Sequence, residues 1–422
     1  MSRDKRVPRL RFPEFRSASR WRTTPLEQIA ERVATKNSDG RVTRVLTNSA
    51  EFGVLDQRDY FDKDIATAGK VDGYYILDKG DYVYNPRTSA MAPVGPISRN
   101  NLGEGVMSPL YTVFRFSADQ TDFYEHYFRS TGWHSYLRSA ASTGARHDRM
   151  SITTGAFMRM PVPTPSLEEQ QKIADCLTSL DEVIAAQRRI VAALKTHKRG
   201  LMQQLFPREG ETRPRLRFPE FRNAPEWRPC VLGELALIVR GGSPRPIDDF
   251  LTHESDGLNW LKIGDVDREA KHVTKTEDKV RPEALSKTRV IQSGDFILSN
   301  SMSFGRPYIS TIETCIHDGW IAVTNIPDDL NRDFLYYSIL SARSQKYFVD
   351  QAAGSGVQNL NKDIIKLLPL ELPSEDEQQR IADCLSSLDT QIAAESHQLA
   401  ALKTHKQGLM QQLFPVMQEL SA

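Results

Sequence analysis

The residue patterns with the clearest potential for chemistry are those of methyl transfer and phosphate binding. Adenine methylation uses N-P-P-[FY] or D-P-P-[YF], in which an aromatic ring stacks on a flipped base. The nearest match here, Asn85-Pro86-Arg87, lacks the second proline and the aromatic ring. A phosphate-binding loop requires G-x-x-x-x-G-K-[ST], whereas Gly241-Gly242 precede Ser-Pro. The sequence therefore predicts a turn at Asn85 and no nucleotide-binding loop.

Acidic pairs, histidines and cysteines give no stronger signal for a metal or a nucleophile. Asp248-Asp249 and Asp328-Asp329 are adjacent carboxylates, which are usually solvated in loops. His197 and His405 lie in the repeated sequence LKTHK, where a surface or partner-facing role is expected. The four cysteines form no C-x-x-C pair, which argues against a zinc knuckle or a disulfide framework and favours a reducing compartment. We therefore expect no catalytic residue and no metal site.

Polar and basic loops carry the signal for nucleic-acid binding. Residues 129–159 hold five arginines and one acid, Asp148, and arginine and amide side chains are groups that read base edges. The second half offers a corresponding polar stretch at 354–362. The predicted DNA-binding residues are Arg87, Arg146, His147, Arg149, Arg245, Ser301, Arg306, Gln358 and Asn359. The alternative, that these are ordinary solvated loops, stays open at each position.

Three of these arginines are the strongest candidates for DNA-facing cations, because they lie in glycine-containing loops. They are Arg146, Arg149 and Arg306. Replacing any one by alanine should weaken DNA binding. If the lost contact is to a phosphate, the slope of log affinity against log salt concentration should also decrease by about 1.

Composition limits the class of protein. The chain has 422 residues, of which 39% are hydrophobic and 26% charged, as is usual for a globular protein. Its 55 basic and 54 acidic residues give a formal charge of +1, which excludes a uniformly basic coat, so any nucleic-acid contact must be local. The start, MSRDKRVPRLRF, has no apolar core of a signal peptide, and no apolar run is long enough to span a membrane. We expect a soluble cytoplasmic protein.

The segments that must position these loops occur as an internal sequence repeat. PRLRFPEFR occurs at 8–16 and again at 214–222, an offset of 206. Residues 166–207 match 374–415 at 30 of 42 positions, with an offset of 208. Two copies are too few for a solenoid, and a pseudo-dimer within one chain fits better. The predicted division is a variable domain at 1–160, a constant helix at 161–207, a variable domain at 208–368 and a constant helix at 369–422.

The constant segments predict two long helices. Each begins at an S-x-x-E capping box, Ser166 with Glu169 and Ser374 with Glu377, and ends before a Phe-Pro pair. About 39 residues at 1.5 Å each give a rod of roughly 58 Å. Apolar residues then follow a heptad pattern that predicts a coiled-coil seam. The seam residues are Ile173, Leu177, Leu180, Ile184, Val191, Leu194, Leu201, Leu205, Ile381, Leu385, Leu388, Ile392, Leu399, Leu402, Leu409 and Leu413.

We expect the two constant helices to pack on each other, because a single exposed seam would be insoluble. The alternative is a helix seam that merely joins domains. Leu180→Asp or Leu388→Asp would place a charge in the seam and should disrupt assembly.

The variable segments predict mixed α/β domains. Residues 70–85 and 288–300 each indicate strand, Gly-Asp turn and strand, and further strands are expected at 106–116 and 320–326. Aromatic and aliphatic residues recur at helical spacing in 122–140 and in 331–349.

The arrangement of two dissimilar variable segments, each followed by a repeated long helix, resembles the DNA-specificity subunit of Type I restriction-modification systems. The resemblance covers nearly the whole chain, and its most specific pieces are the EQQ-I-A-x-C-L-x-S-L-D runs at 169–181 and 377–389, the two PRLRFPEF segments, and the WLKIGDV and GGSP sequences of the second half. It implies a mixed α/β fold in which two target-recognition domains are separated by two long antiparallel helices that form a coiled coil. It also implies that each domain reads one half of an asymmetric bipartite site in double-stranded DNA.

The same resemblance implies which partners supply the chemistry. Two modification subunits would bring S-adenosylmethionine, and restriction or translocase subunits would bring ATP and Mg²⁺, so this chain would hold no cofactor and touch no membrane. The first variable segment lacks the GGSP and WLKIGD sequences, so contact residues are not transferred between the halves. Two other classes stay open: a catalytic methyltransferase or nuclease, and a coiled-coil scaffold that binds only protein.

Overall fold

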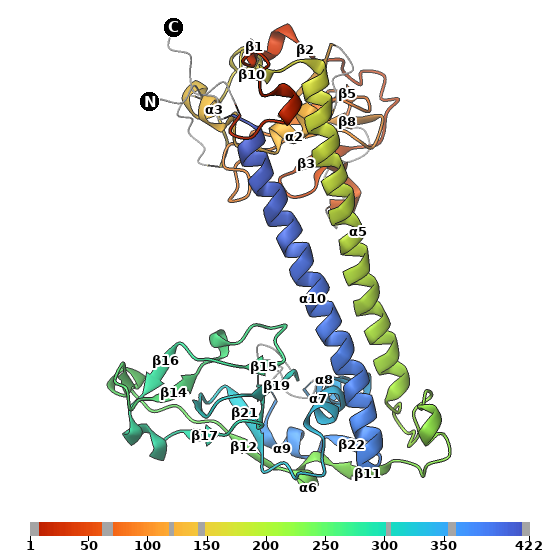
Figure 1. Ribbon diagram of the computed structural model, residues 1–422, viewed down its shortest axis with the longest axis vertical. Helices are drawn as coiled ribbons and strands as arrows, with labels where there is room; N and C mark the ends of the chain where they lie inside the picture. The colour runs from red at the N-terminus through yellow and green to blue at the C-terminus, as the bar shows by residue number, and fades with distance from the viewer. Residues whose placement is uncertain are drawn as a thin grey trace. The chain divides into compact units, whose positions relative to one another are not determined.

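The computed structural model describes residues 8–60, 71–117, 122–141, 148–300, 305–352 and 360–415. The chain folds into two compact units (Figure 1). Unit 1 comprises Met1–Arg188 and His397–Ala422, and unit 2 comprises Arg189–Ser396. Each unit therefore holds one variable segment together with parts of both constant helices. The sequence-based division at 160, 207 and 368 stays a prediction, because these units follow spatial contacts and not the repeat.

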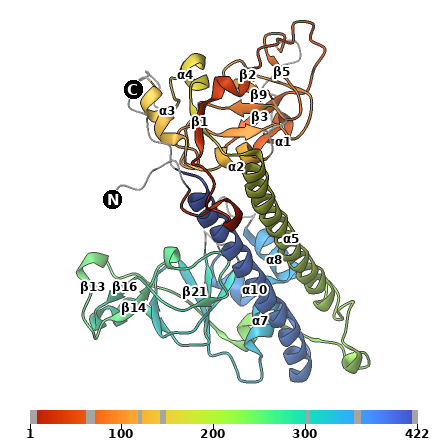
Figure 2. The ribbon, with the colours of Figure 1, turned by 45° about the horizontal axis from the view of Figure 1, so that its top comes forward.

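The variable part of unit 1 is built on short strands (Figure 2). Its elements are η1 (Pro13–Phe15), β1 (Arg22–Pro25), η2 (Leu26–Gln28), β2 (Ala30–Arg32), β3 (Leu46–Ser49), β4 (Gly53–Asp56), α1 (Gln57–Tyr60), β5 (Tyr75–Leu77), β6 (Tyr82–Tyr84), β7 (Ile97–Arg99), β8 (Gly105–Met107), β9 (Thr112–Phe116), α2 (Phe123–Phe128), α3 (His134–Ala140), α4 (Thr154–Met158) and β10 (Pro161–Thr164). A four-stranded sheet has the order β2-β9-β6-β7, and β3-β4 and β5-β8 form two-stranded sheets. Tyr82 and Phe114 on the larger sheet belong to one buried cluster with Phe123 and Tyr127 of α2.

Unit 2 has larger sheets. Its variable elements are η3 (Pro219–Phe221), β11 (Arg228–Val231), α6 (Leu232–Leu235), β12 (Leu237–Arg240), η4 (Ile247–Asp249), β13 (Leu251–Thr252), β14 (Leu258–Leu261), η5 (Ile263–Asp265), β15 (His272–Val273), β16 (Asp278–Val280), η6 (Pro282–Ser286), β17 (Arg289–Ile291), β18 (Phe296–Ser299), β19 (Pro307–Ser310), β20 (Thr314–Ile316), β21 (Trp320–Thr324), α7 (Arg332–Leu340), α8 (Ala342–Ala352), α9 (Lys362–Lys366) and β22 (Pro369–Leu372). Two five-stranded sheets have the orders β12-β21-β18-β19-β15 and β13-β16-β14-β20-β17. The two variable segments, which align poorly in sequence, therefore also differ in the size of their sheets.

The predicted Gly-Asp turns are present, and they connect strands of different sheets. Gly80 and Gly294 adopt φ values of +100° and +91°, which residues with a side chain rarely adopt. In each turn the aspartate carboxylate, that of Asp81 or Asp295, accepts a hydrogen bond of 2.8 Å from the backbone N–H three residues earlier. The strands on either side, β5 and β6 or β17 and β18, then pair with other partners.

Both expected aromatic helices are interrupted. The pattern at 122–140 forms α2 and α3, and a Cβ atom at Gly132, between them, would lie 2.9 Å from the carbonyl oxygen of Pro415. The pattern at 331–349 forms α7 and α8, with Ser341 in an extended conformation between them. The Ser341 hydroxyl accepts a hydrogen bond of 3.3 Å from the backbone N–H of Ser344, as a helix N-cap does.

Each variable segment is closed by pairing its first strand with its last. β1 pairs antiparallel with β10, with Arg22 opposite Thr164, and β11 pairs in the same way with β22, with Arg228 opposite Leu372. The last strand leads directly into a constant helix. Both ends of each variable domain are therefore held at the start of a long helix.

The predicted constant helices are confirmed as α5 (Leu167–Leu205) and α10 (Glu375–Leu413), each 39 residues long. All sixteen predicted seam residues are buried or half-buried. An ion pair joins Asp181 to Lys406 in unit 1, and an equivalent one joins Asp389 to Lys198 in unit 2. Each ion pair joins the first half of one constant helix to the second half of the other, which is the pairing that the predicted antiparallel arrangement requires.

Each PRLRFPEFR segment contacts the start of a constant helix, a contact that the capping-box pattern did not predict. Ser166 Oγ accepts a hydrogen bond of 3.3 Å from the backbone N–H of Glu169, as expected. The Glu169 carboxylate receives two hydrogen bonds from Arg11, of 2.7 and 2.6 Å, and Glu377 receives two from Arg217 at the same distances. The two glutamates therefore join each PRLRFPEFR segment to a constant helix.

Candidate nucleic-acid interface

Four of the nine predicted DNA-binding residues lie in the described part of the chain: Arg87, Arg149, Arg245 and Arg306. The other five, Arg146, His147, Ser301, Gln358 and Asn359, lie outside it. None of these four arginines lies within a named helix or strand.

In unit 1 the structure brings Arg87 and Arg149 together. They are opposite each other in an isolated antiparallel bridge. Hydrogen bonds flank the bridge, from the backbone N–H of Met150 to the Pro86 carbonyl at 2.8 Å and from that of Thr88 to the Asp148 carbonyl at 2.9 Å. The Arg87 side chain is 68% exposed. Two guanidinium-bearing residues 62 positions apart in sequence thus lie on adjacent backbone segments.

In unit 2 the GGSP sequence packs its backbone against the β20–β21 turn. A Cβ atom at Gly241 would lie 2.2 Å from the His317 carbonyl oxygen, and one at Gly242 would lie 2.6 Å from that of Lys287. Only glycine fits at such contacts. This close approach carries the following Ser243 and Arg245 to the carboxylate of the same turn.

The carboxylate of Asp318 organises this loop. Ser243 Oγ donates to one of its oxygens at 2.9 Å and Arg245 Nη2 donates to the other at 3.2 Å. Burial would raise the pKa of Asp318, but these hydrogen bonds and the neighbouring His317 outweigh it and lower that pKa. The Arg245 side chain remains 82% exposed, so its remaining N–H groups are accessible to a ligand.

Arg306 is held differently from the other three arginines. Its Nη2 donates to the backbone carbonyls of Glu269 and Ala270, at 3.0 and 3.4 Å, and its guanidinium lies over the Tyr308 ring. Part of its hydrogen-bonding capacity is therefore used within unit 2. Its role in DNA binding stays a prediction.

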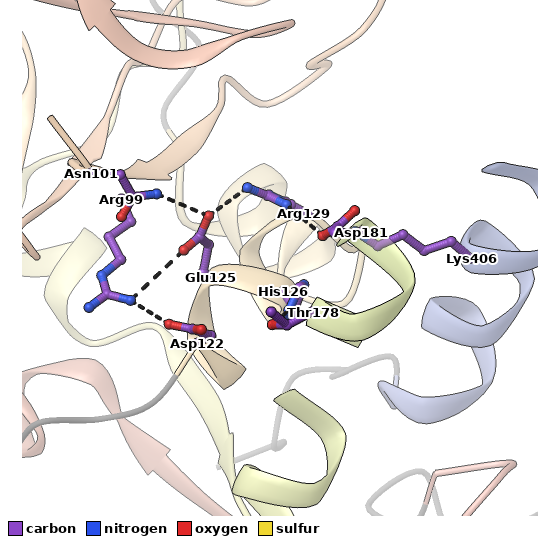
Figure 3. Close-up of polar contacts among 9 residues, drawn as sticks. All are labelled: Arg99, Asn101, Asp122, Glu125, His126, Arg129, Thr178, Asp181 and Lys406. Atoms are coloured by element: carbon purple, nitrogen blue, oxygen red, sulfur yellow. Dashed lines mark hydrogen bonds and ion pairs between the residues drawn. The ribbon is translucent and has the colours of Figure 1, made fainter. Parts of the chain in front are cut away.

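Polar contacts that no sequence motif predicted join the variable domain of unit 1 to the constant helices (Figure 3). His126 of α2 contacts Thr178 of α5 at 3.0 Å, and Arg129 reaches Asp181 at 3.3 Å. Burial, with the nearby charges of Lys406 and Arg129, lowers the pKa of His126 to about 4. The signals in the sequence were the polar residues that recur at the 208-residue offset, among them Lys198 and Lys406 at the same polar slot of both seams.

No group of three or more histidine, cysteine or acidic side chains suited to a metal ion occurs among the residues that the structure describes. Within the same residues, no helix is both long and apolar enough to cross a membrane. The described loops offer arginine hydrogen-bond donors, with Arg87 3.9 Å from the carboxylate of Asp148 and Arg245 3.2 Å from that of Asp318.

The chain matches the family described as the Type I restriction modification DNA specificity domain at residues 66–196 and again at 225–404, together well over half of its length. The chain belongs to this family. The match falls on both variable segments and on the helix that follows each.

Two related proteins of the specificity family come from Methanocaldococcus jannaschii. The chain is 22% identical to a putative type I restriction enzyme MjaX specificity subunit over 271 residues, 62% of this chain and 60% of the relative. It is 24% identical to the type I restriction enzyme MjaVIII specificity subunit over 287 residues, 65% of each. The alignments span less than two thirds of these relatives.

Two solved structures share the fold. A chain from a structural study of complex assembly and conformational transition of the type I R-M system superposes with a TM-score of 0.60 and 20% identity, over 93% of this chain and 97% of that one. The Type-I restriction-modification system S subunit from M. genitalium gives a TM-score of 0.55 and 13% identity, over 98% and 100%. The predicted fold class is therefore confirmed.

Proposed function

We propose that this chain is the sequence-specific DNA-reading subunit of a type I restriction-modification system. The variable segments 22–160 and 228–368 each bind one half of an asymmetric bipartite site, and the chain itself catalyses no reaction. One observation carries the proposal: a single chain presents two dissimilar α/β domains on a duplicated helical frame, and the DNA-specificity family matches both copies. Two different readers on equivalent supports are what an asymmetric two-part site requires.

The proposed partners are two modification subunits, which bind S-adenosylmethionine, and restriction or translocase subunits, which bind ATP and Mg²⁺. This division of labour is supported by the sequence, which carries neither a methyltransferase tetrapeptide nor a phosphate-binding loop. The exposed apolar residues on the outer faces of the constant helices are the proposed docking points for the modification subunits. Val183 and Ile190, one heptad apart on α5, are 48% and 45% exposed there.

A coiled-coil scaffold that binds only protein is the weaker alternative. It would explain two long helices with a buried seam, but it would not explain two divergent globular domains mounted on them. Absence of DNA binding by the assembled complex would favour it.

The contacts that we propose for DNA are the arginines of the two loops, of which Arg87 and Arg245 are exposed and Arg149 is half-buried. Arg87 and Arg149 would act in unit 1, and Arg245 would act in unit 2. Replacing Arg149 by alanine should weaken binding and, if it contacts a phosphate, reduce the slope of log affinity against log salt by about 1. The exposed Arg16 is a control that should change neither quantity, and equal effects of both variants would remove Arg149 from the interface.

The function is tested by mapping methylated adenines in genomic DNA of a host that carries the chain. A bipartite motif should appear that is absent when the gene is deleted. The variable segment 228–368 is then replaced by that of a related chain. Half of the methylated motif should change and the other half should stay the same. A change in both halves, or in neither, contradicts the assignment of one half-site to each segment.

A further inference from the structure

Each unit contains an equivalent set of three polar residues, a hydroxyl residue, an aspartate and a lysine, where a variable domain meets the constant helices. We call Thr178, Asp181 and Lys406 socket 1, and Ser386, Asp389 and Lys198 socket 2. The corresponding members are 208 positions apart, the offset of the constant repeat. In each socket the hydroxyl and the aspartate come from the first half of one helix and the lysine from the second half of the other.

Socket 1 is occupied by α2 of the first variable domain (Figure 3). Lys406 binds Asp181, which also receives Arg129 Nη1 at 3.3 Å. The Lys406 side chain is only 11% exposed. One turn away, buried His126 contacts the hydroxyl of Thr178 at 3.0 Å. A cation and an imidazole from the variable domain therefore fill this socket.

Socket 2 is occupied by α7 of the second variable domain with different chemistry. The Tyr337 hydroxyl donates to Asp389 at 2.6 Å and lies 3.2 Å from Ser386 Oγ. Lys198 Nζ contacts Asp389 at 2.5 Å and also lies 4.9 Å from the centre of the Tyr337 ring. The hydroxyl of Ser386 donates to Asp333 at 3.0 Å, and Asp333 pairs with Lys271 at 2.9 Å.

The constant residues are thus alike in both units, while the variable residues that meet them differ. A neutral tyrosine reaches the aspartate in unit 2, where an arginine does so in unit 1. Each aspartate is bound from two sides, by a lysine of the opposite helix and by the variable domain. Removing the lysine leaves a partly buried carboxylate with one partner fewer, which destabilises that arrangement.

We propose that the two sockets are positioning sites that fix each DNA-reading domain on the helices, and that they act crosswise. Lys198 lies on the helix that follows the first variable segment, yet it positions the second reader, and Lys406 positions the first. This inference rests on the proposed function. It goes further by naming residues, remote in sequence from the DNA-reading loops, that determine how well each half-site is read.

The test compares DNA binding by Lys198→Met and Lys406→Met in the full chain assembled with its modification subunits. Three duplexes are used: the complete site, and the site with one or the other half scrambled. For each half-site, discrimination is the affinity for the complete site divided by the affinity for the site in which that half is scrambled. Lys195→Met and Lys403→Met are matched controls, because these lysines are exposed and lie three residues earlier on the same helices.

Lys198→Met should reduce discrimination about tenfold at the half-site read by 228–368 and leave the other half-site within about twofold. Lys406→Met should do the reverse, and the controls should resemble wild type. The crosswise assignment is wrong if each lysine affects the half-site of its own repeat. Equal loss at both half-sites, or no loss, overturns the positioning role.

Tyr337→Phe keeps the ring and removes only the hydroxyl, so it tests socket 2 even where a lysine variant folds poorly. It should reduce discrimination at the same half-site as Lys198→Met, and discrimination equal to wild type would contradict the proposal. The wild-type chain in the same assay tests the proposed function separately. If the wild type discriminates at neither half-site, the proposed function is wrong, whereas the positioning role of the sockets is judged only from the variants.

Discussion

Arg11 and Arg217 place guanidinium groups where solvent hardly reaches. Their side chains are 9% and 8% exposed, and those of their partners Glu169 and Glu377 are 2% and 1% exposed. Both pairs are bidentate, and each arginine also donates to the backbone carbonyl seven residues further along the chain. Such a pair contributes little net energy relative to an apolar pair of similar shape, but removing one member leaves a buried charge without its counter-ion.

Replacement of Arg217 by methionine should therefore lower the free energy of unfolding by about 3 kcal/mol, because the buried Glu377 loses its counter-ion. Chemical denaturation of the full chain measures this. Arg215→Met, two residues earlier in the same PRLRFPEFR segment and exposed, should change stability by less than about 0.5 kcal/mol. Similar losses in both variants would show that the segment acts through its general charge and not through this pair.

Stability should also depend on pH through His126, whose pKa burial lowers to about 4. An unfolded histidine titrates near 6.5, so between about 6.5 and 4 the unfolded chain binds more protons. Above about pH 6.5 His126 is neutral in both states, and the fold keeps its full stability. As pH falls from about 6.5 to 4, the free energy of unfolding falls by at most ~1.4 kcal/mol per pH unit for one histidine. His126→Gln should flatten this dependence, whereas replacement of the exposed His197 should not. An unchanged slope in His126→Gln would exclude His126 as the source.

The two constant helices are held by their seam. Leu177 and Leu385 are fully buried, in the clusters that also contain the aromatic residues of the variable domains. Leu180 and Leu388, chosen from the heptad pattern for disruption, are half-buried. An aspartate should therefore disrupt the structure more strongly at Leu385 than at Leu388, the next seam position along the helix.

Leu385→Asp should cost about 4 kcal/mol or more, because it removes a buried side chain and places a charge in the cluster. Thermal unfolding monitored by circular dichroism measures the effect. Val183→Asp, on the exposed side of α5, is the control and should unfold close to wild type. If Leu385→Asp unfolds at the wild-type temperature, the seam is assigned to the wrong face.

Local patterns predicted more than long-range ones. The capping boxes predicted the starts of both helices and the Phe-Pro pairs predicted their ends, each to within a residue. The break at Ser341 was not predicted, since helical spacing continues through it. The partner of Glu169 lies 158 residues earlier at Arg11, and only the repetition of PRLRFPEFR indicated that those residues matter. The loop residues proposed to read DNA carry no periodicity, and composition alone suggested them.

Both constant helices belong to both units of the molecule. α5 begins in unit 1 and ends in unit 2, and α10 runs the other way. Under the proposed function, a change in the length of both helices should therefore change the separation of the two DNA-reading domains along DNA. The ion pair of Asp181 with Lys406 sets the register, which places the junction of Ala186 and Gln187 opposite that of Ala400 and Ala401.

Insertion of four helix-forming residues at both junctions lengthens the pair by roughly 6 Å and turns it only about 40° beyond one full turn. With about 3.4 Å per base pair, the readers should move apart by one or two base pairs. The decisive measurement is the methylated motif of a host that carries this double insertion. We expect the same two half-sites with a spacer longer by one or two base pairs. An active variant that methylates the original motif with the original spacer would show that the helices do not set the distance between the readers.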